Sequence, residues 1–252
     1  MTGNVLVVGN WKMNGTSGEA VALASGVRNA LDGVDLWGVT VAVAPPFTAL
    51  SFVRDALVAS PIALAAQNLF WEDAGAFTGE ISPPMLVDLG VRYVIVGHSE
   101  RRQHFGETDD DVRRKTAAAL AHGLVPIVAV GETREERDAG RTDERVVAQT
   151  RAALDGVPRE RLDEIAIAYE PIWAIGSGTN CELDETARVM RAIRASIPGL
   201  DAVPLLYGGS VTPKNFEAYA RLDECSGGLV GGASLDAQSF AAIARIAAGA
   251  RG

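Results

Sequence analysis

Residues 165–197 read IAIAYEPIWAIGSGTNCELDETARVMRAIRASI, and this stretch contains one complete structural repeat. Its first five residues form a continuous apolar and aromatic run, which is typical of a short strand buried on both faces. After a loop, apolar side chains recur at intervals of three or four residues, which predicts one buried face of a helix. These side chains are Leu183, Ala187, Met190, Ile193 and Ile197. The stretch therefore predicts a strand, a loop and a helix in that order.

Similar runs recur along the whole chain, separated by segments with helical periodicity. The predicted strands are Val5–Val8, Val39–Ala44, Ile62–Ala66, Val91–Val96, Val125–Val130, Ile165–Tyr169, Val203–Tyr207 and Gly228–Val230. Dividing 252 residues among eight units gives roughly 31 residues per unit, the size expected for a (β/α)8 barrel. We therefore expect an α/β fold with eight parallel strands surrounded by helices, forming one domain over residues 1–252.

An open, doubly wound sheet is the competing α/β architecture. Such a sheet normally carries a GxGxxG turn after its first strand, whereas this chain has Gly9-Asn10-Trp11-Lys12 there. No linker and no change in composition divides the chain. The sequence therefore favours the closed barrel.

Four places carry the sequence signals that begin helices. Capping-box spacing occurs at Thr16 with Glu19, Thr108 with Asp111 and Thr133 with Glu136. Thr212 followed by Pro213 predicts an N-cap and a first helical residue. We expect a helix to begin at each of the four places.

The composition narrows the class of partner. With 23 basic and 32 acidic residues the net charge is −9, which argues against a broad nucleic-acid interface but leaves room for a small anionic ligand. The two cysteines predict free thiols, and the three histidines lack metal-site spacing. Neither a basic leader with an apolar core nor an apolar run of about 18 residues is present. We expect a soluble, cytoplasmic protein that binds no metal, nucleic acid or membrane.

Polar and glycine-rich clusters follow the predicted strands directly. They are Asn10–Lys12, Gly97–Arg102, Glu170–Gly178, Gly208–Ser210 and Gly231–Ser234. The carboxyl ends of barrel strands meet at one rim, and active sites of such barrels lie on that rim. One charged residue there would be an ordinary solvated loop residue, but five converging clusters predict a site.

Glu170 and His98 are the candidate proton-transfer groups. Glu170 leaves a buried strand and enters an apolar loop, an environment that raises a carboxylate pKa toward the range of a general base. A structural ion pair with an arginine is the alternative. His98 precedes a short predicted helix at Ser99–Arg102, whose dipole would keep the ring neutral and able to donate to a carbonyl oxygen. A purely structural histidine is its alternative.

Lys12 and the glycine clusters point to an anionic ligand. Lys12 is one of only three lysines in the chain, and Glu100 is the nearest acid at a strand end that can pair with it. Glycines in Gly208–Ser210 and Gly231–Gly232 let backbone N–H groups approach a ligand closely. Tight turns alone could explain them, but phosphate sites after strands seven and eight recur in this architecture. A small phosphorylated molecule is the expected ligand.

Eight segments occur in an order that resembles the triosephosphate isomerase family and spans the chain from end to end. The segments are Gly9–Asn14, Ala66–Asn68, Gly75–Glu80, Gly97–Arg102, Phe105–Glu107, Tyr169–Gly176, Tyr207–Ser210 and Leu229–Ser234. The resemblance implies interconversion of dihydroxyacetone phosphate and D-glyceraldehyde 3-phosphate through an enediol, in glycolysis and gluconeogenesis. It implies no metal and no organic cofactor.

The resemblance also assigns roles, which are those known for the family. Glu170 would move the carbon-bound proton, neutral His98 would polarise the carbonyl and Lys12 would stabilise negative charge, supported by Glu100. Asn10 would bind the substrate oxygens. Backbone groups of Gly176, Ser210, Gly231 and Gly232 would hold the phosphate. The segment from Pro171 to about Cys181 resembles the family's mobile lid, which excludes water from the enediol.

The loop from Gln67 to Ile81 is roughly fifteen residues long without a clear helix, and loops of that length are usually functional. It carries Phe70, Trp71 and Phe77, which suggest a partner surface. In the family this loop inserts into a second subunit, with the residue matching Thr78 near the partner's site. We therefore expect a homodimer whose isolated monomer is poorly active.

The chain departs from the family pattern in two places. Ala129 stands where the family commonly has cysteine, which affects packing rather than chemistry. Thr179–Cys181 replaces the usual end of the lid and brings in a thiol that is sensitive to oxidation if exposed.

Two other functions compete with triose phosphate isomerisation. One is a paralogue acting on tetrose phosphates, and the other is a non-catalytic barrel that binds a sugar phosphate. The second predicts loss of a proton-transfer residue, and none is lost.

Overall fold

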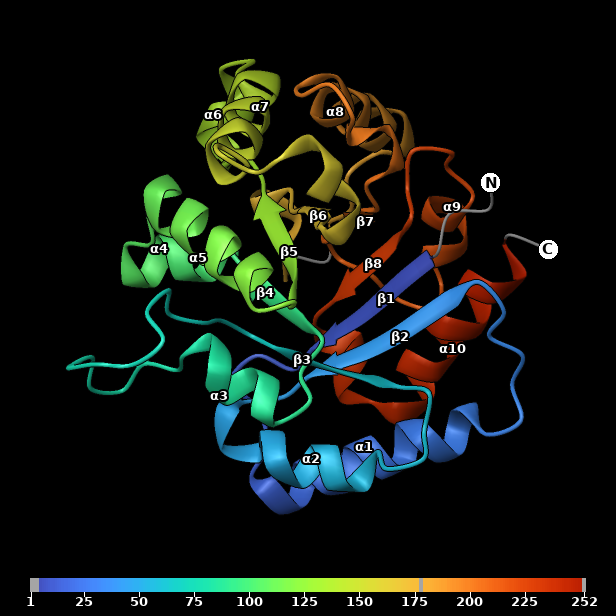
Figure 1. Cartoon of the computed structure of the whole chain (residues 1–252). Coiled ribbons are helices and arrows are strands. Elements are labelled where there is room, and N and C mark those ends of the chain that lie inside the picture. The colour runs from blue at the N-terminus through green and yellow to red at the C-terminus, as the bar shows by residue number, and fades with distance from the viewer. Residues whose placement is uncertain (1–4, 177–178, 251–252) are drawn as a thin grey trace.

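Eight parallel strands close into a barrel in which each strand pairs with its neighbours in chain order (Figure 1). The computed structural model describes residues 5–176 and 179–250. The strands are β1 (Val5–Asn10), β2 (Val39–Ala44), β3 (Ala63–Ala66), β4 (Tyr93–Val96), β5 (Val125–Val130), β6 (Ala166–Tyr169), β7 (Leu205–Tyr207) and β8 (Gly227–Val230). All eight predicted strands are confirmed, with ends that shift by at most two residues.

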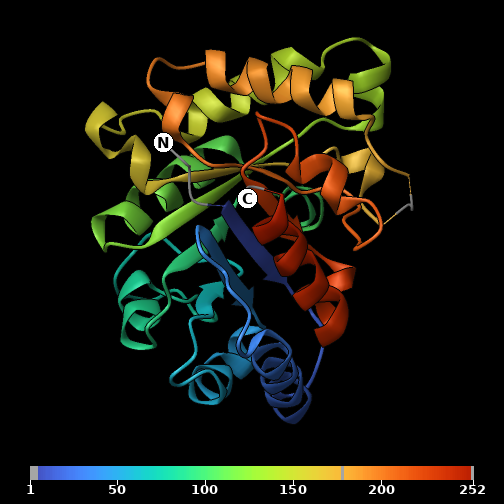
Figure 2. The ribbon, with the colours of Figure 1, turned by 90° about the vertical axis from the view of Figure 1, so that its right-hand side faces the viewer.

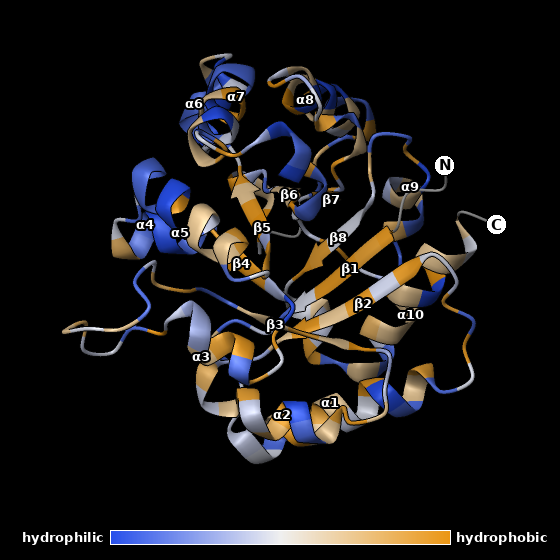
Figure 3. Ribbon diagram, viewed as in Figure 1, coloured by the Kyte–Doolittle hydropathy of each residue, from blue (hydrophilic) through white to orange (hydrophobic). Residues whose placement is uncertain are grey.

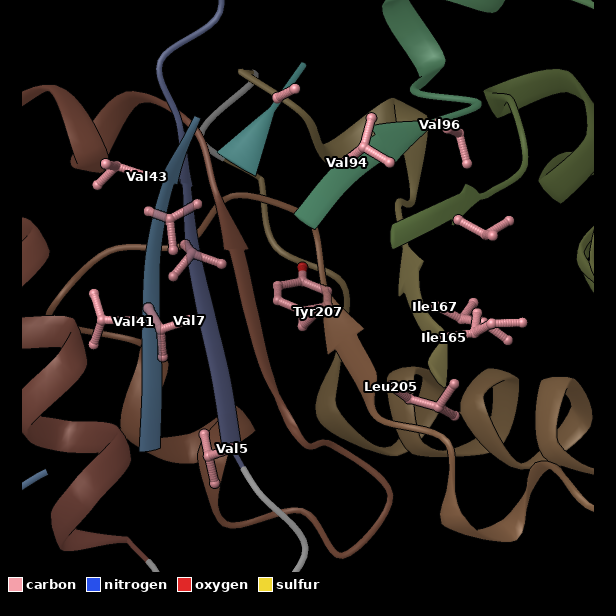
Figure 4. Packing of buried hydrophobic residues seen from close by; sticks show 14 of the residues in the cluster. Val5, Val7, Val41, Val43, Val94, Val96, Ile165, Ile167, Leu205 and Tyr207 are labelled. Atoms are coloured by element: carbon pink, nitrogen blue, oxygen red, sulfur yellow. The ribbon is translucent and has the colours of Figure 1, made fainter. Parts of the chain in front are cut away.

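The strands are continuous apolar runs because both of their faces are buried. Alternate residues such as Leu6, Val8 and Ile95 fill the barrel interior. The residues between them pack outward in a second core shared with the helices. Figure 4 shows part of this outer core, with Val41 and Val43 on β2. One-sided alternation would have left one of these two cores unfilled.

Helices surround the barrel and cover every strand (Figures 1 and 2). They are α1 (Ser17–Leu31), α2 (Leu50–Ala56), α3 (Pro83–Asp88), α4 (Ser99–Phe105), α5 (Asp109–Ala121), α6 (Arg134–Asp138), α7 (Thr142–Ala153), α8 (Leu183–Ala195), α9 (Phe216–Ala220) and α10 (Ala237–Gly249). At least one helix lies between every two consecutive strands, as the sequence predicted. No helix in the described ranges is long and apolar enough to span a membrane.

Three of the four predicted helix starts are confirmed. Both hydrogen bonds of a capping box form at Thr16, Thr108 and Thr133, the residues that precede α1, α5 and α6. The prediction at Thr212 is wrong, since α9 begins at Phe216, three residues after the predicted first helical residue Pro213. Residues 213–215 form a turn there, in which the Thr212 carbonyl accepts the N–H of Asn215 at 3.2 Å and Oδ1 of Asn215 accepts the N–H of Thr212 at 2.8 Å.

Hydrophilic residues are frequent on the outer helices, as Figure 3 shows for α4, α6 and α7. Acidic residues occupy the first turns of α5, α6, α7 and α8, where they interact favourably with the helix dipole.

Closure of the barrel between β8 and β1 requires glycine at position 227. Its φ is +135°, and a Cβ there would lie 2.0 Å from the carbonyl oxygen of Leu6 on β1. We expect Gly227→Ala to lower the free energy of unfolding by about 3 kcal/mol or more, measured by chemical denaturation. Gly140→Ala is the matched control, because its φ is +70° but its Cβ would meet open space; we expect a loss of about 1 kcal/mol there. Equal losses in the two variants would contradict the role given to Gly227.

Candidate active site

A pocket of about 410 Å³ opens at the carboxyl ends of the strands. Its volume lies within the range of small-molecule sites. Eight of the predicted site residues line it: Asn10, Lys12, His98, Glu170, Gly176, Ser210, Gly231 and Gly232. They come from five separate strand ends, so the barrel brings together the clusters that the sequence singled out. Trp11, Asn14 and Leu235 also line the pocket, although no chemical signal in the sequence marked them.

Glu170 is the most enclosed carboxylate of the pocket, with only 2% of its surface exposed. Its Oε2 accepts the backbone N–H of Ser99 at 3.0 Å. Its Oε1 lies 3.1 Å from Nε2 of His98. The structure therefore aims the candidate base directly at the candidate acid.

Two glycines fit closely around the backbone and side chain of Glu170. A Cβ at Gly131 would lie 1.7 Å from the Glu170 carbonyl oxygen, and a Cβ at Gly208 would lie 2.8 Å from its Cγ. The N–H of Glu170 donates to the carbonyl of Val130 at 2.7 Å. Glycine is thus required directly after β5 and β7, the strands on either side of β6. Gly131 carries no local sequence signal for this role, because the contact is made across strands.

His98 is the N-cap residue of α4, as expected from the short helix predicted after it. The backbone N–H of Glu100 donates to its Nδ1 at 3.2 Å. That nitrogen is therefore an acceptor, and the ring proton lies on Nε2, facing Glu170. Burial, the largest influence, lowers the pKa of His98, but the charge and hydrogen bond of Glu170 raise it overall. Protonating Nδ1 would set that N–H against the N–H of Glu100, so this hydrogen bond opposes the effect of Glu170 and favours the neutral ring.

The pKa of Glu170 differs from the sequence expectation. Burial is the largest influence and raises it, but His98, the N–H of Ser99 and the charge of Lys12 together lower it below its ordinary value. The apolar loop alone predicts a raised pKa, because these three partners lie far from Glu170 in the sequence. In the ligand-free geometry the carboxylate is therefore ionised.

Lys12 is held in a strained backbone conformation with φ 53°. Its N–H donates to Oδ1 of Asn10 at 3.0 Å, and its carbonyl accepts from Nε2 of Gln67 at 2.8 Å. Its Nζ pairs with Oε1 of Glu100 at 2.5 Å, which confirms the predicted ion pair. No local sequence pattern predicts this contact of Gln67, since Gln67 lies 55 residues from Lys12 in the chain.

The ends of β7 and β8 form the glycine-rich side of the pocket. A Cβ at Gly209 would lie 2.3 Å from the hydroxyl oxygen of Tyr207, so this turn tolerates only glycine. A Cβ at Gly231 would lie 3.5 Å from Cε of Lys12, and none of the atoms around Gly232 lies within 4 Å of its Cβ position. Backbone groups and one ammonium therefore face the same space, which suits a phosphate.

The lid segment, residues 171–181, runs from the end of β6 to the start of α8. Its residues 177–178 lie outside the described part of the chain. Nε1 of Trp173 donates to Oε1 of Glu132 at 2.7 Å, and burial raises the pKa of Glu132. Cys181 is 1% exposed, so the condition for an oxidation-sensitive thiol is not met.

Two predicted supporting residues do not line the pocket. Glu100 contacts two lining residues, through its ion pair with Lys12 and through its N–H to Nδ1 of His98, and its side chain is 42% exposed. Thr78 is exposed on the Gln67–Ile81 loop, which projects from the barrel body in Figure 1. Within one chain, Thr78 therefore has no place in the site.

The described residues contain no group of three or more histidine, cysteine or acidic side chains that could hold a metal ion.

Comparison with known proteins identifies the family. The family model for triosephosphate isomerase matches residues 5–247. The chain belongs to the triosephosphate isomerase family. Triosephosphate isomerase of Chloroflexus aurantiacus is 51% identical over 245 residues, covering 94% of this chain and 97% of that protein. The same enzyme from a Roseiflexus species is 50% identical over 244 residues, covering 94% and 95%. The enzyme from a Synechococcus strain is 49% identical over 242 residues, covering 95% of each chain.

Membership of the triosephosphate isomerase family confirms the resemblance drawn from the eight segments, and the chain is an isomerase. Of the three functions considered from the sequence, the comparisons support triose phosphate isomerisation. The family's usual cysteine is replaced by Ala129 inside β5, where it is 1% exposed and pairs in register with Ala168. The replacement thus lies in the barrel wall and does not line the pocket.

The pairing of Glu170 makes stability depend on pH. A carboxylate with a lowered folded pKa stabilises the fold above its unfolded pKa, near 4.5, and loses that effect as pH falls through the folded pKa. We expect the difference in unfolding free energy between the native chain and Glu170→Gln to shrink as pH falls below about 4.5. Denaturant titrations from pH 7 to pH 3 measure it. A difference that grows on acidification would show that the folded pKa is raised instead.

Proposed function

We propose that Glu170, His98, Lys12 and Asn10 carry out the interconversion of dihydroxyacetone phosphate and D-glyceraldehyde 3-phosphate. The observation that carries this proposal is the direct 3.1 Å contact between Glu170 and His98 within one pocket. A carboxylate beside a neutral imidazole can move a proton between carbons while a second proton moves between oxygens. The pair supplies both transfers of an aldose–ketose isomerisation.

Substrate binding changes the strength of the base. The Nε2 proton of His98 now faces Glu170, and a substrate carbonyl oxygen placed in the pocket competes for that proton. When His98 donates to the substrate instead, Glu170 loses the partner that lowers its pKa and keeps the burial that raises it. The carboxylate then becomes a stronger base at the moment it must take the carbon-bound proton.

The remaining groups bind charge. Lys12 stabilises the oxyanion of the enediol, and the amide of Asn10 binds substrate oxygens. Backbone groups of Gly176, Ser210, Gly231 and Gly232 hold the phosphate. Protons are the only atoms that change place, and the electrons balance within the substrate. We therefore propose that the reaction uses no cofactor.

The role of Glu170 is tested by Glu170→Gln, which removes the base but keeps the side-chain size. We expect turnover in a coupled assay with dihydroxyacetone phosphate to fall roughly a thousandfold, within the usual range for a general base. Glu160→Gln is the control, since Glu160 is exposed outside the pocket, and it should keep full turnover. Near-normal turnover of Glu170→Gln would refute the assignment.

We also propose that the chain forms a homodimer through the Gln67–Ile81 loop. Phe70 packs against Trp71 and Phe77 with ring centroids 4.1 and 4.6 Å apart, which gives the loop its own small core. Phe77 is nevertheless 42% exposed. Thr78, next to Phe77, is exposed and does not line the pocket of its own chain, which leaves it free to contact a partner. We further propose that residues 1–252 form one domain. We also propose that the protein acts in the cytoplasm, in glycolysis and gluconeogenesis.

A charge at Phe77 tests the assembly. We expect Phe77→Asp to weaken the dimer at least tenfold, since an unpaired carboxylate would be buried in the interface, and to lower activity per chain. Sedimentation and activity at the same concentrations measure both effects. Val58→Asp changes another exposed residue, 67% accessible and remote from the loop, and should leave the dimer intact. A fully active Phe77→Asp dimer of unchanged affinity would refute the interface.

A further inference from the structure

Two tyrosines meet where the lid segment returns to the barrel. The rings of Tyr207, at the end of β7, and Tyr219, in α9, are stacked with centroids 4.0 Å apart and an interplanar angle of 10°. The hydroxyl of Tyr219 donates to the carbonyl of Cys181 at 2.6 Å. The N–H of Cys181 donates to the hydroxyl of Tyr207 at 3.2 Å. Cys181, the last residue of the lid segment, is therefore held on both sides by one stacked pair.

This cluster is closed to solvent. Cys181 is 1% exposed, Tyr207 is fully buried and Tyr219 is 3% exposed. Burial raises the pKa of both tyrosines, so both hydroxyls keep their protons. A buried carbonyl that loses a strong donor is costly, because water cannot replace the donor. The contact between Tyr219 and Cys181 is thus a fixed attachment point.

The same pair also touches the glycine-rich side of the pocket. Tyr207 directly precedes the Gly208–Ser210 turn, and its hydroxyl occupies the space that a Cβ at Gly209 would need. A shift of the Tyr207 ring would therefore disturb that turn. Tyr219 stacks on this ring from α9, outside the pocket, and is not among the residues that line it.

We propose that Tyr219 is a positioning residue that fixes the end of the lid segment and the Gly208–Ser210 turn relative to each other. The inference rests on the pocket roles proposed above. Its effect is to keep the lid segment seated over the bound phosphate while the enediol exists, which excludes water and holds the phosphate ester in place.

An enediol that is poorly held decomposes. The electron pair of the enediolate oxygen forms a carbonyl, the carbon–carbon double bond moves toward the ester carbon, and the carbon–oxygen bond to phosphate breaks. Inorganic phosphate leaves with the bonding electrons, and an unsaturated hydroxyaldehyde remains. No oxidant or reductant is needed. Phosphate released per isomerisation turnover therefore reports how well the pocket holds its intermediate.

Tyr219→Phe removes the hydroxyl and keeps the stacked ring. We expect phosphate release per turnover to rise about fivefold, the factor that corresponds to one ordinary buried hydrogen bond. Tyr93→Phe is the matched control: Tyr93 is the first residue of β4, at the opposite end of the barrel, and is 7% exposed. It should leave the ratio unchanged.

Amide hydrogen exchange provides a second measurement that does not depend on activity. We expect peptides covering Cys181 to exchange faster in Tyr219→Phe than in the native chain, while peptides from β4 exchange equally. Unchanged phosphate release together with unchanged exchange at Cys181 would overturn the inference. If Tyr219→Phe lowers the melting temperature but leaves phosphate release per turnover and exchange at Cys181 unchanged, Tyr219 is structural only and the inference is equally wrong. Failure of the native chain to isomerise would instead overturn the pocket roles.

Discussion

Pairing between the last strand and the first is the constraint on which the site depends. β8 pairs with β1 in register from Leu6 with Gly227 to Gly9 with Val230, so the ladder has no free edge. Every strand then ends at one rim, and a residue near the start of the chain meets residues near its end. Lys12 lies beside Gly231 in this way. Without closure, the cation and the glycine-rich turns would have no common space.

The pocket must accommodate negative charge in a chain whose net charge is already −9. An acidic chain must attract an anion and must also bury the carboxylate of Glu170 next to it. Three groups from other elements satisfy that carboxylate in the free state: the Nε2 side of His98, the N–H of Ser99 and the charge of Lys12. The first of these is also the group that we propose engages the substrate. In that proposal, binding transfers a donor from the base to the substrate and requires no new donor.

Much of this arrangement was predictable from the sequence, because it rests on local patterns. Strands buried on both faces leave continuous apolar runs, and the three capping boxes are spaced by helix geometry alone. The predicted start at Thr212 failed because a turn over residues 213–215 precedes α9, and a Thr-Pro dipeptide does not distinguish such a turn from the first turn of a helix. The pKa direction of Glu170 failed for a related reason: its partners come from β4 and β1, at distances along the chain that no local pattern encodes.

The backbone of Lys12 had no sequence signal at all, and it shows how strain is maintained at a site. A non-glycine residue at φ 53° is unfavourable by about 1–3 kcal/mol and persists only where surrounding groups over-determine it. Here the Asn10 side chain holds the N–H of Lys12 and the Gln67 side chain holds its carbonyl, while Glu100 holds the ammonium. Gln67 also donates to the carbonyl of Ala44 at 2.9 Å, which ties the same amide to the end of β2. Since Gln67 is the first residue of the Gln67–Ile81 loop, which we propose as the dimer interface, the backbone geometry of Lys12 depends on where that loop begins.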